Sequence, residues 1–188
     1  MVPSIVLNAF LVIVNLVCIP IGLKKLGFLG LFRYFTVLSN VLCALCSAVV
    51  LCAWTTGALP LWAILLKFVG TAAVSVTLLT VFLYLGPVSG EWKYLLSGPD
   101  LFWHLFCPLI AIVSLCVFEH TDFGFGWVFT ALIPVVLYGI FYLWRVVLLP
   151  EDRRMEDFYG FNKTGKWPIS MLIIFVLAFT AGVVLWAV

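Results

Sequence analysis

The sequence predicts an all-α membrane protein, a bundle of six transmembrane helices with short loops. Of its 188 residues, 65% are hydrophobic and only 10% are charged, a composition that is not typical of a water-soluble domain of this length. The hydrophobic residues form six runs, each about as long as the ~20 residues that a helix needs to cross the hydrocarbon of a bilayer. The sequence contains no internal repeat, low-complexity tract or separate soluble domain, so residues 1–188 are expected to form a single domain.

The first three predicted spans are separated by segments that contain Gly, Pro or basic residues. Residues 3–23 lack the basic flank and the cleavage site of a secretory signal, so we expect this run to stay attached as a span. The segment KKLGFLGLFR separates it from the second run, at 32–54. The segment TTGALP then interrupts the pattern before the third run, at 60–86.

The last three predicted spans have similar boundaries. The segment SGPD places a proline early in the fourth helix, at 99–118, and EHTDFGFG separates that helix from the fifth, at 127–149. The one polar stretch of the chain, PEDRRMEDFYGFNKTGKWP, precedes the sixth run, at 167–188. Tryptophans fall near the predicted ends, as expected for indoles at a membrane interface.

The basic residues predict the orientation, because Lys and Arg near helix ends are retained on the cytoplasmic side. They occur in the first, third and fifth connections, whereas the second and fourth contain none. We therefore expect the odd-numbered connections to face the cytoplasm and both termini to lie on the opposite side. The residues concerned are Lys24, Lys25, Arg33, Lys93, Arg153, Arg154, Lys163 and Lys166.

Composition also limits the partners. The net charge is only +2, and the Lys and Arg residues form no stripe that could follow a phosphate backbone, so nucleic-acid binding is not expected. Membrane lipids are the expected partners. The sequence leaves the oligomeric state open.

The sequence does not predict a metal site. Cys43 and Cys46 on the second helix, with His104 and Cys107 on the fourth, have spacings that suit a soft metal. At the helical rise, however, Cys46 lies ~21 Å and His104 ~8 Å from the cytoplasmic ends of their helices, too far apart for one ion. The cysteines are interpreted as packing residues, and no metal or cofactor is expected.

Polar side chains within the spans mark candidate sites, because an unpaired polar group is costly in hydrocarbon. Counted from the cytoplasmic ends of their helices, Thr36 lies ~6 Å and His104 ~8 Å deep. The two side chains therefore share a level. Asn40 follows Thr36 by one turn on the same helix face, and Asp100 precedes His104 by one turn.

These four side chains match the requirements of acyl transfer. We predict Thr36 as nucleophile and His104 as base, with Asp100 orienting the imidazole and Asn40 or a backbone N–H stabilising the oxyanion. Each side chain also has a structural alternative. A hydroxyl can bond back to its own helix, an imidazole or amide can join two helices, and Asp100 can form a capping box with Ser97.

A polar stripe on the fifth helix predicts substrate-binding groups. Tyr138, Tyr142 and Arg145 follow i, i+4, i+7 spacing and share one face. Arg145 is predicted either to hold an anionic group of the substrate or to extend toward lipid phosphates. On the third helix, Lys67 is expected to extend toward the opposite interface in the same way.

Two segments of the chain resemble a known family. FRYFTVLSNVLCA of the second helix and GPDLFWHLFCPLI of the fourth resemble the androgen-induced-protein-like family of six-helix membrane hydrolases, its microbial members most closely. The characterised animal members hydrolyse fatty-acid esters of hydroxy fatty acids within the membrane, using a threonine on an early helix and a histidine on a later one. The resemblance implies Thr36 as the nucleophile and His104 as its partner.

The expected function is therefore intramembrane hydrolysis of lipid acyl esters that arrive from the cytoplasmic leaflet. The alternative is a non-enzymatic membrane transporter, or a lipid- or ligand-binding scaffold in which the same groups hold a solute. Transporters usually contain internal repeats or helices interrupted at paired positions, and we find no such pairing.

Overall fold

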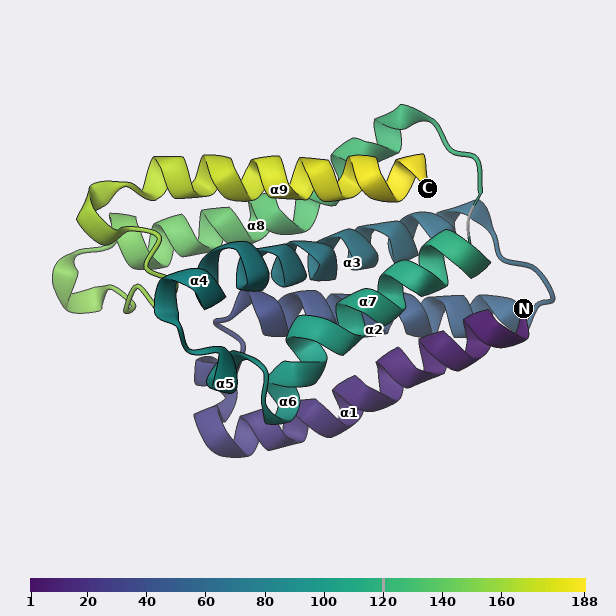
Figure 1. Cartoon of the computed structure of the whole chain (residues 1–188), viewed down its shortest axis with the longest axis horizontal. Helices are drawn as coiled ribbons and strands as arrows, with labels where there is room; N and C mark the ends of the chain where they lie inside the picture. Colours follow the sequence, from purple (N-terminus) through teal and green to yellow (C-terminus); the bar gives the residue numbers. More distant parts are fainter. Residues whose placement is uncertain (120) are drawn as a thin grey trace.

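The chain folds into a bundle of helices that run along one long axis (Figure 1). The computed structural model describes residues 1–119 and 121–188, which contain no strand. Six helical segments within these ranges are long and apolar enough to cross a membrane. The predicted all-α six-helix bundle is confirmed, and the chain is an integral multi-pass membrane protein. The spans are Val2–Leu31, Phe35–Trp54, Leu61–Ser89, Gly98–Phe118, Phe125–Leu148 and Trp167–Ala187.

Two of the spans are continuous helices, one is broken by a kink, and three change helix type along their length. The continuous ones are α2 (Phe35–Trp54) and α9 (Trp167–Ala187), and α1 (Val2–Leu31) is kinked at Gly27. The third span comprises α3 (Leu61–Thr80), a π-helical turn (Val81–Leu85) and α4 (Gly86–Ser89). The fourth comprises α6 (Gly98–Leu101), a π-helical turn (Phe102–Phe106), α7 (Cys107–Val113) and a second π-helical turn (Ser114–Phe118). The fifth comprises a 3₁₀-helix (Phe125–Ala131), α8 (Leu132–Tyr142) and a π-helical turn (Leu143–Leu148), and α5 (Trp92–Leu95) lies in the third connection.

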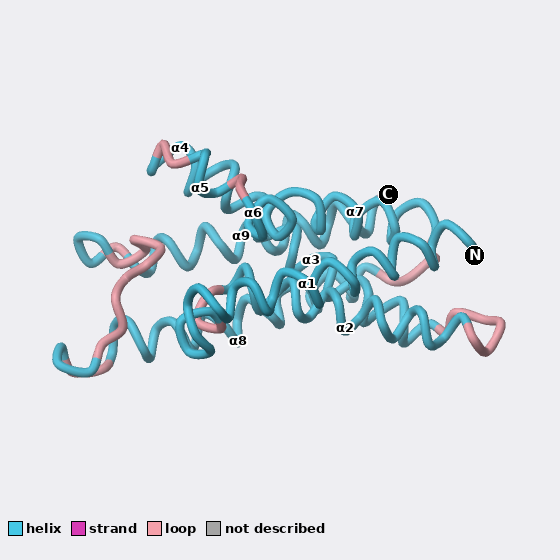
Figure 2. The backbone as a smooth tube through the Cα atoms, turned by 90° about the horizontal axis from the view of Figure 1, so that it is seen from below, coloured by secondary structure: helices cyan, strands magenta, loops and turns pink. Residues whose placement is uncertain are grey.

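The third span lies at the centre of the bundle. Its most apolar window is 61% buried, whereas the corresponding windows of the other spans are 22–44% buried. Small residues permit this close packing. A Cβ atom placed on Gly70 would lie 3.2 Å from the Cα atom of Cys43 in α2. α3 packs against α2, α7, α8 and α9, whereas α1 packs mainly against α2 (Figures 1 and 2).

The first span is longer than predicted. We expected it to end at residue 23, but α1 continues to Leu31 and bends at Gly27, whose φ is 69°. A positive φ is readily adopted only by glycine, which has no Cβ. After the bend, Leu31 packs back on Gly22 and is 1% exposed. Leu31 thus packs within the bundle, whereas Leu26, Phe28 and Leu29 are exposed on its surface.

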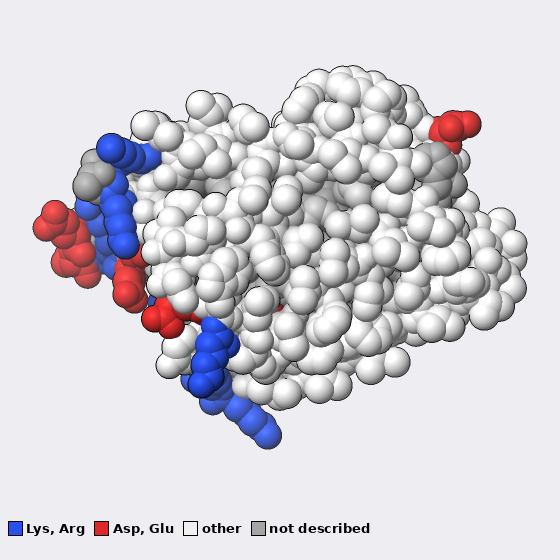
Figure 3. Space-filling view, in the orientation of Figure 1, with Lys and Arg blue, Asp and Glu red and all other residues white. Residues whose placement is uncertain are grey.

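Charged side chains gather at one end of the bundle (Figure 3). The odd-numbered connections lie at this end, and both termini lie at the other (Figure 1). This arrangement follows from six crossings in alternating direction. It places the first turn of α2 and the start of the fourth span at the charged end.

Candidate functional site

Thr36 lies in the first turn of α2, at the charged end of the bundle. Tyr34 precedes the helix with extended backbone angles, and no side chain caps the helix through a conventional N-cap bond. The N–H of Phe35 has no acceptor within the helix and instead donates to the Tyr159 hydroxyl, at 2.9 Å. The connection between α8 and α9 therefore provides an acceptor that the sequence around Thr36 lacks.

His104 lies in the π-helical turn before α7, and its side chain is 6% exposed. The turn has a local cause. Pro108 has no N–H to donate to the His104 carbonyl four residues earlier, so the regular helical bond is lost there. The Nδ1 atom of His104 lies 2.6 Å from the Leu95 carbonyl oxygen. Because a carbonyl only accepts, the neutral ring carries its hydrogen on Nδ1, and Nε2 keeps a lone pair that can take a proton.

Thr36 and His104 line the same cavity, which we call the polar hollow. It has a volume of about 420 Å³ and is bounded by the first four spans and by the third and fifth connections. Of the hydrogen bonds among the described residues, none joins Thr36 to His104 directly. The hollow is large enough for water or part of a substrate between them. Its lining includes the polar or charged residues Lys25, Ser89, Glu91, Tyr94 and Asp100.

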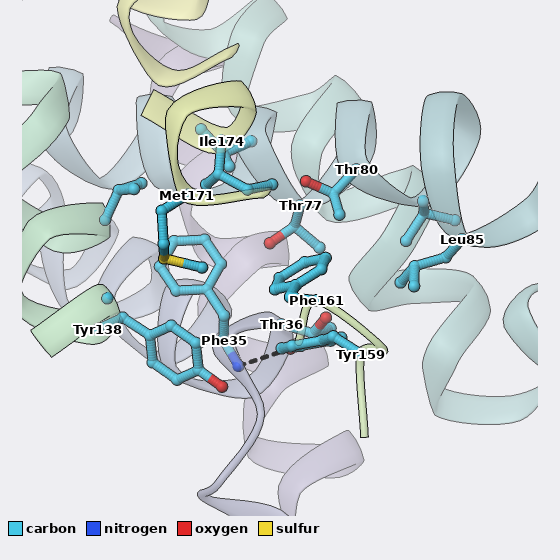
Figure 4. A pocket seen from close by; sticks show the side chains of 14 residues that line it. Phe35, Thr36, Thr77, Thr80, Leu85, Tyr138, Tyr159, Phe161, Met171 and Ile174 are labelled. Atoms are coloured by element: carbon cyan, nitrogen blue, oxygen red, sulfur yellow. Dashed lines mark hydrogen bonds between the residues drawn. The ribbon is translucent and has the colours of Figure 1, made fainter. Parts of the chain in front are cut away.

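A second cavity reaches Thr36 from the other side. This apolar slot lies between α2, α3, α8 and α9, and its walls are mainly hydrophobic (Figure 4). The slot is narrow, with a volume of about 40 Å³, so an acyl chain would have to displace flexible side chains such as Met171. Of the described residues, Thr36, Leu85 and Tyr159 line both the slot and the polar hollow. Thr36 therefore lies where an apolar space meets a polar one.

Asn40 joins α2 to the fourth span. Its Nδ2 atom donates to the Thr36 carbonyl at 2.8 Å and to the Trp103 carbonyl at 3.1 Å. Both amide hydrogens are used in this way, and the buried Oδ1 atom has no hydrogen-bond partner in the described part of the chain. Asn40 thus holds the two candidate catalytic segments together. In this state it has no hydrogen left for an oxyanion.

Asp100 lines the polar hollow one turn before His104. We predicted that Asp100 would accept a hydrogen bond from the His104 imidazole. The Nδ1–H of His104 instead donates to the Leu95 carbonyl. The Asp100 carboxylate interacts electrostatically with His104 and with Lys25. The alternative helix cap is not formed either, because α6 has no side-chain cap at Ser97. Asp100 therefore lines the hollow beside His104 without the predicted hydrogen bond to its imidazole.

The predicted stripe on the fifth span divides into two groups. Tyr138 lines the apolar slot, and its hydroxyl donates to the Arg33 carbonyl at 2.7 Å. Arg145 lines neither the slot nor the hollow, and its guanidinium lies over the Trp144 ring, 5.4 Å from the centroid. The structure thus brings Tyr138 to the Thr36 region and leaves Arg145 outside it.

Tyr142 anchors the fifth connection. It is 1% exposed, and its hydroxyl donates to the Asp157 carboxylate. The same carboxylate accepts the backbone N–H groups of Phe161, at 3.1 Å, and Asn162, at 2.8 Å. This local structure directs Tyr159 into the bundle.

Tyr159 and Leu95 were not identified from the sequence. The fifth connection was interpreted as an ordinary polar loop because it contains many charges. The one available signal was its aromatic segment FYGF, which does not fit a fully solvated loop. The Leu95 carbonyl is a backbone group, and no sequence pattern reveals it.

A second polar cluster lies near the end of the bundle that holds the termini. The Lys67 ammonium donates to Asn8 Oδ1 at 2.7 Å and to Ser47 Oγ at 3.0 Å, and its side chain is fully buried. The Asn8 amide in turn donates to the carboxylate of Glu119, which is 2% exposed. The expectation that Lys67 extends to the interface is wrong, because these acceptors hold its ammonium inside. Ser4 and Ser114 also donate to Glu119, each at 2.7 Å.

The candidate metal ligands are placed in the core. Cys43 and Cys107 are 0% exposed and pack with Leu11, Val74 and Ala111. Within the described ranges, no group of three or more His, Cys, Asp or Glu side chains could hold a metal ion.

Comparison of the chain with protein-family models, with curated proteins and with solved structures gives no match.

Proposed function

We propose that this protein is an intramembrane hydrolase of lipid acyl esters, of the type formed between a fatty acid and a hydroxy fatty acid. One observation carries the proposal. Thr36 lies at the junction of an apolar slot inside the bundle and a polar hollow that contains His104. An amphipathic ester needs both environments, one for an acyl chain and one for water and the released group.

The chemistry follows from the two side chains. The Thr36 Oγ1 atom attacks the ester carbonyl carbon while its proton passes to His104 Nε2, directly or through one water. The carbonyl electron pair moves to oxygen and gives a tetrahedral oxyanion. Collapse of this intermediate breaks the ester C–O bond, and the leaving alkoxide takes the proton from the imidazolium. Water activated by His104 then hydrolyses the acyl-threonine.

A groove between α2 and α8 supports delivery of the substrate from the bilayer. It has a volume of about 270 Å³, and its lining is mostly apolar, including Leu38, Leu42 and Leu137. Phe35 and Tyr138 line both this groove and the apolar slot, and their ring centroids are 5.2 Å apart. Rotation of these two rings would connect the lipid phase to Thr36.

The proposal extends to the family and the orientation. The segments around Thr36 and His104 support membership of the androgen-induced-protein-like family. The gathering of basic residues at the Thr36 end of the bundle supports a cytoplasmic position for that end. The ester would then arrive from the cytoplasmic leaflet.

Covalent labelling of the purified protein in lipid nanodiscs tests the function. A fluorophosphonate carrying an alkyl chain should label the wild type, and peptide mass spectrometry should place the adduct on Thr36. Thr36→Ala should abolish labelling, and His104→Ala should slow it by at least about 100-fold, as expected for loss of a general base. Thr130→Ala is a matched control, because Thr130 is a membrane threonine that lines neither cavity. Equal labelling of Thr36→Ala and the wild type would reject the nucleophile.

A further inference from the structure

The oxyanion donor predicted from the sequence is already occupied, so another group must stabilise the charge that forms at Thr36. Both Nδ2 hydrogens of Asn40 bond to backbone carbonyls. His104 cannot serve either, because its Nδ1 hydrogen is given to Leu95 and its Nε2 atom acts as the base. A hydrolase of this kind usually depends strongly on such a donor.

Tyr159 occupies the required position. Among the described residues, Thr36, Leu85 and Tyr159 line both the apolar slot and the polar hollow. Apart from Thr36 itself, Tyr159 is the one member of this group with a polar side chain. The Phe35 N–H, one residue before Thr36, donates to its hydroxyl oxygen at 2.9 Å. The oxygen therefore accepts from the backbone and keeps its own hydrogen for donation.

The fifth connection fixes this phenol from several sides. The Asp157 carboxylate holds the turn around Tyr159, and the Tyr159 ring stacks on Phe161 with centroids 5.0 Å apart. Burial raises the pKa of Tyr159 to about 12, although hydrogen bonds from Phe35 and Thr36 oppose the rise. The phenol consequently stays protonated, and able to donate, throughout the neutral range.

We infer that Tyr159 is a catalytic residue of the proposed hydrolase, whose O–H donates a hydrogen bond to the oxyanion formed when Thr36 attacks the ester. No proton is transferred in this step, because the phenol only stabilises the negative oxygen until the alkoxide leaves. The Phe35 N–H holds the phenol oxygen in place as the charge develops. This assignment rests on the proposed function.

Tyr159→Phe tests the assignment, with Tyr84→Phe as the matched control. Both substitutions remove one phenol hydroxyl and both rings pack on Phe161, but Tyr84 lines neither the slot nor the hollow. With p-nitrophenyl octanoate as substrate, Tyr159→Phe should lower kcat about 100- to 1,000-fold and leave KM nearly unchanged, as for loss of an oxyanion donor. Tyr84→Phe should change kcat by less than about fivefold. Equal effects of the two substitutions would overturn the assignment.

A second variant separates a catalytic role from a structural one. Difluorotyrosine at position 159 keeps the ring and its hydroxyl but ionises at lower pH, so the alkaline limb of the kcat profile should move to lower pH. An unmoved limb would contradict the assignment even if Tyr159→Phe failed to fold. The two hypotheses also fail differently. A wild type that neither labels nor turns over ester rejects the proposed function, whereas an active wild type with a fully active Tyr159→Phe variant rejects only the role of Tyr159.

Discussion

Replacement of Lys67 by methionine should strongly destabilise the bundle. Methionine matches the length of the lysine stem but removes the ammonium, so Asn8 and Ser47 lose a charged donor and the Glu119 carboxylate remains buried without its counter-charge. Two hydrogen bonds to a charged group are together worth about 3–6 kcal/mol. Lys67 and Glu119 are bridged by the Asn8 amide, and removal of one partner of a buried pair of charges costs up to about 3–5 kcal/mol. Both estimates give a decrease of ~4 kcal/mol in the free energy of unfolding. For a chain of this length this corresponds to a decrease of roughly 8–16 °C in Tm.

The assay is thermal unfolding in detergent micelles, followed by tryptophan fluorescence, which is sensitive here because Trp54 Nε1 donates to Ser4 within the cluster. Lys93→Met is the control, because Lys93 is exposed at the other end of the bundle. The double variant Lys67→Met with Glu119→Gln removes both charges and should recover at least half of the lost Tm. If Lys67→Met is no less stable than Lys93→Met, or if the double variant recovers nothing, the two buried charges do not form a pair.

Three further predictions concern the charged end and the central helix. The pKa of Tyr159 is raised from its ordinary value of 10.0 to about 12 in the folded protein. Between pH 10 and 12 the unfolded chain therefore loses the phenol proton that the folded chain keeps. Wild-type stability should therefore fall over this range, and pH-dependent unfolding should show a smaller fall for Tyr159→Phe. Asp157→Asn weakens the turn in the fifth connection, so limited proteolysis should cut residues 149–166 faster than in the wild type, whereas exposed Asp152→Asn should not change the rate. Gly70→Leu should lower Tm by roughly 2–12 °C, the equivalent of roughly 1–3 kcal/mol of overpacking against α2, whereas Gly126→Leu, where a Cβ meets open space, should not.

The six spans could be predicted from the sequence because hydrocarbon demands long apolar helices and the breaks between them contain Gly, Pro and charge. The end of the first span could not. Residues 24–31 combine two lysines with two glycines, and only the packing of Leu31 on Gly22 shows that the span extends past the kink at Gly27. Its boundary depends on a contact between distant turns and not on local pattern.

The candidate site was predictable to the level of residue type and depth. Thr36 and His104 line one hollow because both begin helices at the same end of the bundle. Their immediate partners were not predictable, since Leu95 contributes a backbone carbonyl and Tyr159 comes from a loop more than 120 positions after Thr36. Such partners depend on how connections fold over the bundle end, and helical periodicity carries no information about this.

The central position of the third span has a consequence for biogenesis. Lys67 is synthesised more than fifty residues before Glu119. The central helix α3 therefore leaves the ribosome before the carboxylate that balances its lysine charge has been made. Asn8 and Ser47 can accept hydrogen bonds from the Lys67 ammonium at once, because both lie on earlier helices. The opposite charge arrives only with the end of the fourth span. Insertion of the third helix into lipid should therefore remain reversible until that segment emerges, which makes the fourth span the step that commits the chain to its membrane topology.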